Sequence, residues 1–173
     1  MLVEENPVAA RRIVSHLGDL LRRVLDRTEA QEIPLADELE LLDPYLEIER
    51  LRFQDRLSVT VHVQDEARRA LVPVFILQPI VENAVRHGIE RHAGEGRLDV
   101  RAAVREDRLV IEVDNAARNG NATPPGAWRE GIGLSTTRER LRMLYGPNQE
   151  IHIEARDGRT RVALRIPFRR ESA

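Results

Sequence analysis

Hydrophobic positions recur along the chain at two different spacings, and the change from one spacing to the other marks the expected elements. Spacings of three and four residues are typical of amphipathic helices, and alternation at every second residue is typical of strands. The first pattern predicts helices over residues 7–27, 37–53, 72–86 and 133–144, with Pro44 expected to kink the second. The second predicts strands over residues 57–63, 97–104, 109–114, 150–155 and 160–167.

After the first helix, the order is helix, strand, helix, strand, strand, loop, helix, strand, strand. This order predicts an α+β fold, a two-layer α/β sandwich with about five strands in a mixed, mostly antiparallel sheet and three helices on one face. Residues 115–130 are rich in Asn, Gly, Ala and Pro. They lie between a strand end and a helix start, which is a usual place for a ligand lid. The additional helix at 7–27 either packs on this domain or pairs with a second copy in a dimer.

The helix expected at 72–86 is apolar on most sides, yet polar residues gather near its end. A buried helix rarely tolerates Glu82, Asn83, Arg86 and His87 so close together unless something polar lies against them. Asn83 is our candidate ligand for Mg²⁺, because this ion prefers oxygen ligands and is often shared between one protein group and substrate phosphates. The alternative is an asparagine that is hydrogen-bonded locally, outside any functional site.

The neighbours of Asn83 have two interpretations each. Glu82 and Arg86 have the spacing and order of a stabilising helical ion pair, or Glu82 orients a metal-bound water. Arg86 and His87 could meet phosphate groups, and His87 could equally cap the helix end before Gly88.

Two further segments could complete a nucleotide site. Asp114 ends an apolar strand, where its carboxylate could accept a hydrogen bond from an adenine amino group, or it could start a turn with Asn115. Gly131 and Gly133 precede a helix whose first N–H groups and dipole could hold phosphate. Alternatively, the two glycines form only a flexible hinge.

Composition narrows the class of protein. The 173 residues include 42% hydrophobic residues and no cysteine, which supports a real core and excludes disulfides and thiolate metal sites. The net charge of −2 gives no reason to expect nucleic acid or an anionic membrane as a partner. All 27 basic residues are arginine, which excludes a P-loop ATPase and a lysine-dependent protein kinase. The pattern also contains no membrane span and no signal peptide, so we expect a cytoplasmic protein or portion.

Four stretches of the chain resemble the ATP-binding half of LytS-type sensor histidine kinases, which have the Bergerat (GHKL) nucleotide fold. Residues 73–88, Pro-Val-Phe-Ile-Leu-Gln-Pro-Ile-Val-Glu-Asn-Ala-Val-Arg-His-Gly, resemble that family's N box and are the most specific match. Residues 35–53 resemble its preceding helix, residues 131–146 its second glycine box, and residues 158–167 its closing hairpin. The resemblance covers nearly the whole chain. It implies part of a dimerisation region at 1–30 and an ATP-binding domain at 31–173.

The resemblance also implies roles for particular residues. Asn83 would bind Mg²⁺ and, with Glu82, form the catalytic centre, while Asp114 would accept from the adenine amino group and Thr160 would meet the adenine edge. The remaining positions that would contact ATP are Arg86, His87, Gly131, Gly133 and Leu134. The implied partners are Mg-ATP, a response regulator and, in the full-length kinase, a second copy of the chain.

The chain departs from the family pattern at its first glycine box and at its phosphoacceptor. Residues 114–118, Asp-Asn-Ala-Ala-Arg, stand where Asp-x-Gly-x-Gly is usual, and Thr136 stands where asparagine is common. Asn6-Pro7 is not followed by the family's acceptor histidine, and His16 aligns poorly with it. We therefore expect a fragment of a longer kinase that binds adenine nucleotide without phosphorylating itself. The alternatives are a degenerate, non-catalytic domain that acts in dimerisation or signalling, and a GHKL hydrolase that uses Glu82 as base.

Overall fold

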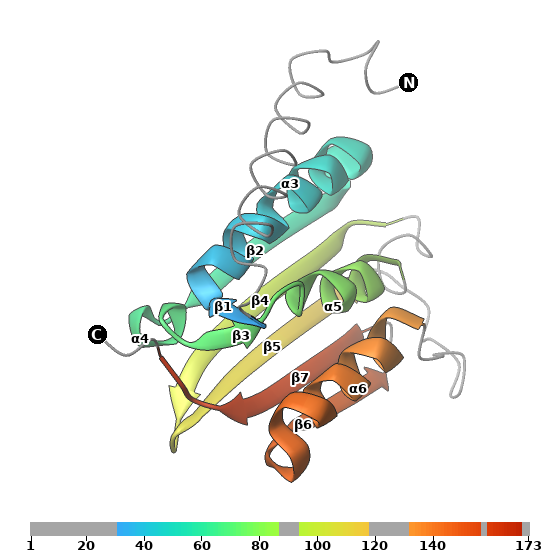
Figure 1. The fold of residues 1–173 in the computed structure, drawn as a ribbon. Coiled ribbons are helices and arrows are strands. Elements are labelled where there is room, and N and C mark those ends of the chain that lie inside the picture. The colour runs from blue at the N-terminus through green and yellow to red at the C-terminus, as the bar shows by residue number, and fades with distance from the viewer. Residues whose placement is uncertain (1–30, 87–93, 118–131, 157–158, 171–173) are drawn as a thin grey trace.

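A computed structural model describes residues 31–86, 94–117, 132–156 and 159–170 (Figure 1). In this part of the chain, two short strands, β1 and β3, form a separate antiparallel pair, and five longer strands form the main sheet. The elements in chain order are β1 (Glu32–Pro34), α3 (Leu35–Phe53), a 3₁₀ turn (Gln54–Arg56), β2 (Leu57–Val63), α4 (Asp65–Arg68), β3 (Leu71–Pro73), α5 (Leu77–Ala84), β4 (Gly96–Arg105), β5 (Arg108–Ala117), α6 (Ile132–Tyr145), a 3₁₀ turn (Gly146–Asn148), β6 (Glu150–Arg156) and β7 (Arg159–Pro167).

The main sheet has the strand order β2-β4-β5-β7-β6. β2 and β4 are parallel, and the other three neighbouring pairs are antiparallel. Helices α3, α5 and α6 lie side by side across one face of this sheet (Figure 1). The predicted two-layer sandwich, with a mixed and mostly antiparallel five-stranded sheet, is therefore confirmed.

The core lies between the helices and the sheet, and it is built by alternate strand residues. In β5, Leu109, Ile111 and Val113 are buried, and the register pairs Val113 with the buried Val162 of β7. Because successive strand residues point to opposite faces, the residues between these positions belong to the face that the helices leave uncovered. This parity decides which side chains of β5 can reach the helix layer.

The prediction of a helix over 72–86 is wrong at its beginning. Residues 71–73 form β3, in which Val72 pairs with Ile33 of β1, and the helix begins only at Leu77. Between them, Phe75 has a φ of 59°, a left-handed conformation that is uncommon for a residue with a large side chain. The apolar run therefore contains a strand, a turn and a short helix. Pro44 lies inside α3, which is assigned as one helix from Leu35 to Phe53.

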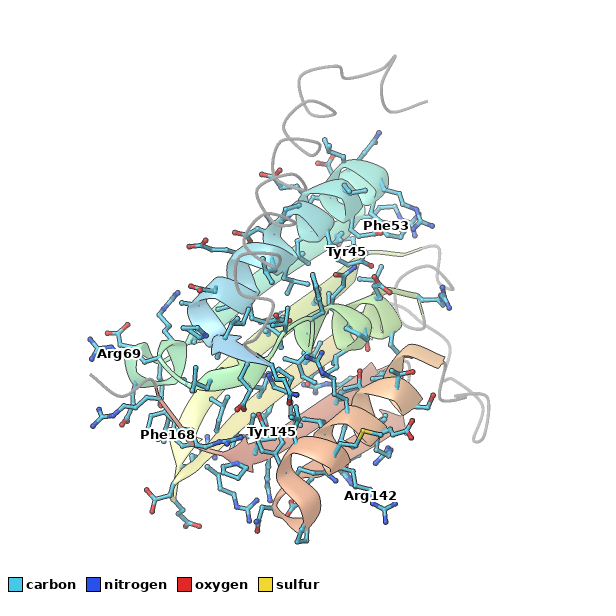
Figure 2. The ribbon with its side chains drawn as sticks, in the orientation of Figure 1. Tyr45, Phe53, Arg69, Arg142, Tyr145 and Phe168 are labelled. Atoms are coloured by element: carbon cyan, nitrogen blue, oxygen red, sulfur yellow. The ribbon has the colours of Figure 1, made fainter. Side chains whose placement is uncertain are left out.

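A cluster at one end of the domain joins three segments that are distant in the sequence. Tyr145, labelled in Figure 2, ends α6, and its hydroxyl donates to the carboxylate of Glu32 in β1. Arg169 donates to the same carboxylate at 2.9 Å and stacks 4.9 Å from the centre of the Tyr145 ring. Burial, followed by the interaction with Glu32, raises the pKa of Tyr145 well above its usual value. These contacts fix the start of the described domain against α6.

The helix expected at 7–27 and most of the expected lid lie outside the described residues. The first three residues of that predicted loop, 115–117, instead continue β5. Among the described helices, none is both long enough and apolar enough to cross a membrane.

Candidate functional site

The predicted site elements meet at one end of the sandwich. The end of α5, the start of α6, the end of β5 and the start of β7 lie near one another there (Figure 1). The strand register places Asn115 of β5 opposite Thr160 of β7. Three elements that are separated in sequence therefore come together around the last turn of α5.

Asn83 lies in this last turn with an unusual environment. Its side chain is only 8% exposed, and its amide nitrogen has no hydrogen-bond partner among the described residues. A buried polar group without a partner costs about 1–3 kcal/mol. Because rotation by 180° exchanges the oxygen and nitrogen of an amide, the same position can present an oxygen to a cation. The geometry thus fits a residue whose partner is a ligand.

Glu82 and Arg86, the neighbours of Asn83, face outward. Both residues are exposed. Glu82 accepts a hydrogen bond from Gln78 Nε2 at 2.8 Å, so its observed partner is Gln78 rather than Arg86. The carboxylate of Glu82 remains reachable from solvent, next to the buried amide of Asn83.

Asn115 joins the last turn of α5 to the sheet. Its side chain is fully buried, and its amide nitrogen donates to the carbonyl oxygen of Ala84, the residue after Asn83. Its Oδ1 accepts from the backbone N–H of Thr160 at 2.9 Å. Thr160 is itself buried. One asparagine therefore connects α5, β5 and β7 beside the predicted metal ligand.

Asp114 lies on the other side of the sheet from this site. Its register partners are Asp99 and Arg161, and alternation places it on the face opposite Val113 and Asn115. There the Arg159 guanidinium binds both of its carboxylate oxygens, with the Nε–Oδ1 bond at 2.7 Å. The hydrogen bond and the charge of Asp114 raise the pKa of Arg159. The register therefore places Asp114 on the face of the sheet opposite to the helix layer that contains Asn83.

The physical reason for this discrepancy is strand parity. The expected site assumed that β5 ended at Asp114, whereas the strand continues to Ala117. The inward positions Leu109, Ile111 and Val113 lead to Asn115 as the next residue on the helix face. The alternation in the sequence contains this signal, although the interpretation of Asp114 did not use it.

The start of α6 packs directly on α5. A Cβ added to Gly133 would lie 3.4 Å from Cβ of Pro79, so the two helices approach closely at this point. The Thr137 hydroxyl donates to the Gly133 carbonyl at 2.8 Å. Leu134 is buried in the hydrophobic core, so its side chain contributes to packing. Gly131 and His87 lie outside the described residues.

The described residues include no group of three His, Asp or Glu side chains that could hold a metal ion by themselves. A magnesium ion at Asn83 would therefore need oxygen atoms from water and phosphate, which is its usual manner of binding at nucleotide sites. A groove of about 810 Å³ lies elsewhere, bordered by residues such as Arg142, His152 and Arg165, and none of the predicted site residues lines it.

Comparisons with known proteins agree with the fold. Residues 1–57 match the family model described as histidine kinase. A histidine kinase domain from the blue-light activated kinase of Erythrobacter litoralis has a similar structure, with a TM-score of 0.62 and 21% identity over 92% of this chain and 75% of that chain. The sandwich is therefore the fold of a histidine kinase catalytic domain.

Sequence relatives narrow the class further. The chain is 33% identical over 172 residues, 99% of its length, to the sensor histidine kinase BtsS of Escherichia coli K12. It is 27% identical over 177 residues, 97% of its length, to the sensor protein LytS of Staphylococcus epidermidis. The chain spans about 30% of the length of each relative. Over nearly its whole length, the chain is therefore similar to sensor histidine kinases, including a LytS protein.

Proposed function

We propose that this chain binds Mg-ATP as the catalytic domain of a two-component sensor histidine kinase. The observation that carries the proposal is the buried amide of Asn83, whose nitrogen has no hydrogen-bond partner among the described residues. Relationship to sensor histidine kinases supports the reaction class. The phosphoacceptor would be a histidine in a part of the full-length kinase that this chain does not contain.

Asn83 would hold Mg²⁺ through its amide oxygen. The ion would neutralise phosphate charge, which phosphoryl transfer requires. Glu82 is exposed beside Asn83 and would orient a water molecule bound to the ion. Arg86, exposed at the end of the same helix, would lie within reach of phosphate oxygens.

The start of α6 would hold the phosphate chain. The first N–H groups of a helix have no partners within the helix, and the positive end of the dipole favours anions. The close approach of Gly133 to Pro79 keeps this helix start against α5. Asn83 and the α6 start would then act on the same phosphates, so catalysis would consist mainly of positioning and charge neutralisation.

The adenine base would lie on the helix side of the sheet, near Asn115 and Thr160. Asn115 is fully buried and joins the Ala84 carbonyl to the Thr160 N–H. It would therefore support the floor of the adenine pocket from beneath rather than contact the base, with Thr160 beside it.

The proposal is tested by titration calorimetry with a non-hydrolysable ATP analogue, with Mg²⁺ and with EDTA. The intact chain should bind the analogue, and Mg²⁺ should tighten binding at least about tenfold, which corresponds to about 1.4 kcal/mol. Asn83→Ala should abolish the tightening, whereas Asn148→Ala, at an exposed asparagine after α6, should retain it. Equal affinities with Mg²⁺ and with EDTA in the intact chain would contradict the assignment of Asn83.

A second candidate function is a degenerate domain that retains the fold and acts in dimerisation or signalling. Two observations favour it. Residues 114–118 depart from the usual first glycine box, and Asp114 already forms an ion pair with Arg159. No binding at millimolar nucleotide in the same titration would support this function. A response regulator and a second copy of the kinase remain proposed partners of the full-length protein in both cases.

A further inference from the structure

The turn that precedes α5 is held by side chains from the two helices on either side of it. Glu38 of α3 is 1% exposed, and its two carboxylate oxygens accept from the backbone N–H groups of Phe75 at 2.8 Å and Leu77 at 2.9 Å. Arg140 of α6 donates to the carbonyl oxygen of Val74. All three helices of the layer therefore meet at residues 74–77.

This turn needs support from outside itself. The left-handed conformation of Phe75 is strained for a residue with a large side chain and persists only where surrounding contacts fix it. Ile76, the residue before α5, provides no side-chain cap for the helix. The first N–H groups of a helix lack internal partners, and a carboxylate near them is stabilised by the helix dipole. Glu38 thus caps α5 from another helix.

Burying this carboxylate is costly, which indicates that the turn depends on it. Burial raises the pKa of Glu38 to about 7, despite the backbone hydrogen bonds and the positive charge of Arg140, which act in the opposite direction. An apolar side chain would avoid this cost but would leave the Phe75 and Leu77 N–H groups without a partner.

Helix α5 is short and is fixed at both ends. Its eight residues span about 12 Å, so a displacement at its start moves its end as well. Glu38 holds the beginning, and Asn115 holds the Ala84 carbonyl at the end. Asn83 lies between these two attachments, one residue before Ala84.

We infer that Glu38 is a positioning residue for Asn83: through the turn at 74–77, it sets the place of the amide that would bind magnesium. This inference rests on the proposed function of Asn83. Glu38 touches neither nucleotide nor metal in this account. Its effect should therefore appear in the magnesium-dependent part of nucleotide binding.

The test uses Glu38→Gln, which keeps the shape of the side chain but replaces one acceptor oxygen with a donor that faces a backbone N–H. The magnesium-dependent tightening of ATP-analogue binding should fall about tenfold, whereas affinity in EDTA should change less than about twofold. Two controls are Glu66→Gln, at an exposed residue of α4, and Ile166→Val, a mild change in the core at β7. Both controls should retain the tightening. A merely structural role would lower affinity equally with and without Mg²⁺.

A second measurement separates this inference from the proposed function. In the nucleotide-free protein, the Asn83 side-chain amide resonances should shift in Glu38→Gln and in Glu38→Asp, and should stay in place in both controls. Absence of nucleotide binding by the intact chain would end the proposed function, whereas unchanged Asn83 resonances would end the inference. If Glu38→Gln does not fold, Glu38→Asp, which keeps the charge and shortens the side chain, decides the question by the same two readouts.

Discussion

Replacing Asn115 and Asp114 separately should lower the free energy of unfolding by different amounts, because the structure places these adjacent residues on opposite faces of the sheet. Asn115→Ala removes a donor to Ala84 and an acceptor for Thr160. Asp114→Asn removes the charge of a pair with Arg159 on the face without helices. The two changes therefore distinguish a buried connection to the helix layer from an ion pair on the opposite face of the sheet, whose arginine is exposed.

The magnitudes follow from burial. Asn115→Ala leaves a buried carbonyl and a buried N–H without partners, at about 1–3 kcal/mol each, so the free energy of unfolding should fall by about 2–6 kcal/mol. The Asp114 side chain is only 4% exposed, whereas its partner Arg159 is 59% exposed, so solvent screens the pair on the arginine side alone. Because Arg159 is largely in solvent and an asparagine can still accept one of its hydrogen bonds, Asp114→Asn should cost about 1–2 kcal/mol.

Urea unfolding followed by far-ultraviolet circular dichroism measures both values, and unchanged m-values would show that the surface exposed on unfolding is the same. Nucleotide titration of Asp114→Asn should give an affinity within about twofold of the intact chain. For comparison, a tenfold weaker affinity corresponds to a loss of about 1.4 kcal/mol of binding free energy.

A large loss of nucleotide affinity in Asp114→Asn, with no loss of stability in Asn115→Ala, would refute this placement. It would return Asp114 to the base-binding role implied by family resemblance. Asn115→Asp adds a check on the amide itself, since a carboxylate can accept from Thr160 but cannot donate to Ala84. Its stability should lie below that of the intact chain.

Three other predictions test separate parts of the fold. Burial raises the pKa of Glu38 from its usual 4.5 to about 7, so between these values the folded state holds a proton that the unfolded state has lost. Stability should therefore fall as the pH rises from about 4.5 to about 7, by on the order of 3 kcal/mol, and urea midpoints of Glu38→Gln should lack this slope. Glu106 and Asp107 both have positive φ in the β4–β5 turn, so the double change to Asn and Gly should raise stability by about 0.5–1 kcal/mol in the same assay. Tyr145→Phe removes the hydrogen bond to Glu32 and should lower stability by about 1–2 kcal/mol, measured by thermal unfolding with calorimetry.

Each of these three predictions has a result that would contradict it. If the stability of Glu38→Gln fell with pH as steeply as that of the intact chain, the proton would belong to another group. If the Asn-Gly variant were less stable than the intact chain, the turn would depend on its present side chains. A Tyr145→Phe variant as stable as the intact chain would show that the hydroxyl contributes nothing net.

The sheet was predictable because local alternation determines it. Strands predicted at 57–63 and 150–155 are observed at Leu57–Val63 and Glu150–Arg156. Their alternating hydrophobic residues match a sheet with one face on the core, a pattern that is visible in a single segment.

The start of α5 was not predictable from local pattern. Residues 71–77 form a continuous apolar run, and periodicity alone does not distinguish a buried strand from part of a buried helix. The turn at Phe75 is fixed by Glu38, which lies 37 residues earlier in the chain, and by Arg140 of α6. A conformation that depends on distant partners leaves no local signal.

The candidate site was predicted in part. The expected buried polar residue on an apolar helix is present, because the structure places Asn83 in the last turn of α5 with a buried amide. Asp114 was expected to face the site both as a carboxylate at a strand end and from the family resemblance, whereas parity along β5 places Asn115 on the helix face. Glu38 was missed as a site-supporting residue because its role depends on tertiary contact alone.

Paramagnetic NMR tests the central claim most directly, since it reports on Asn83 itself. Mn²⁺ would replace Mg²⁺ in a complex with a non-hydrolysable ATP analogue, and the side-chain amide resonances of Asn83 would be followed during its addition. The account predicts that they broaden beyond detection before those of Asn148, and only when nucleotide is present. Asn83 resonances that persist at saturating Mn²⁺ and nucleotide would contradict it.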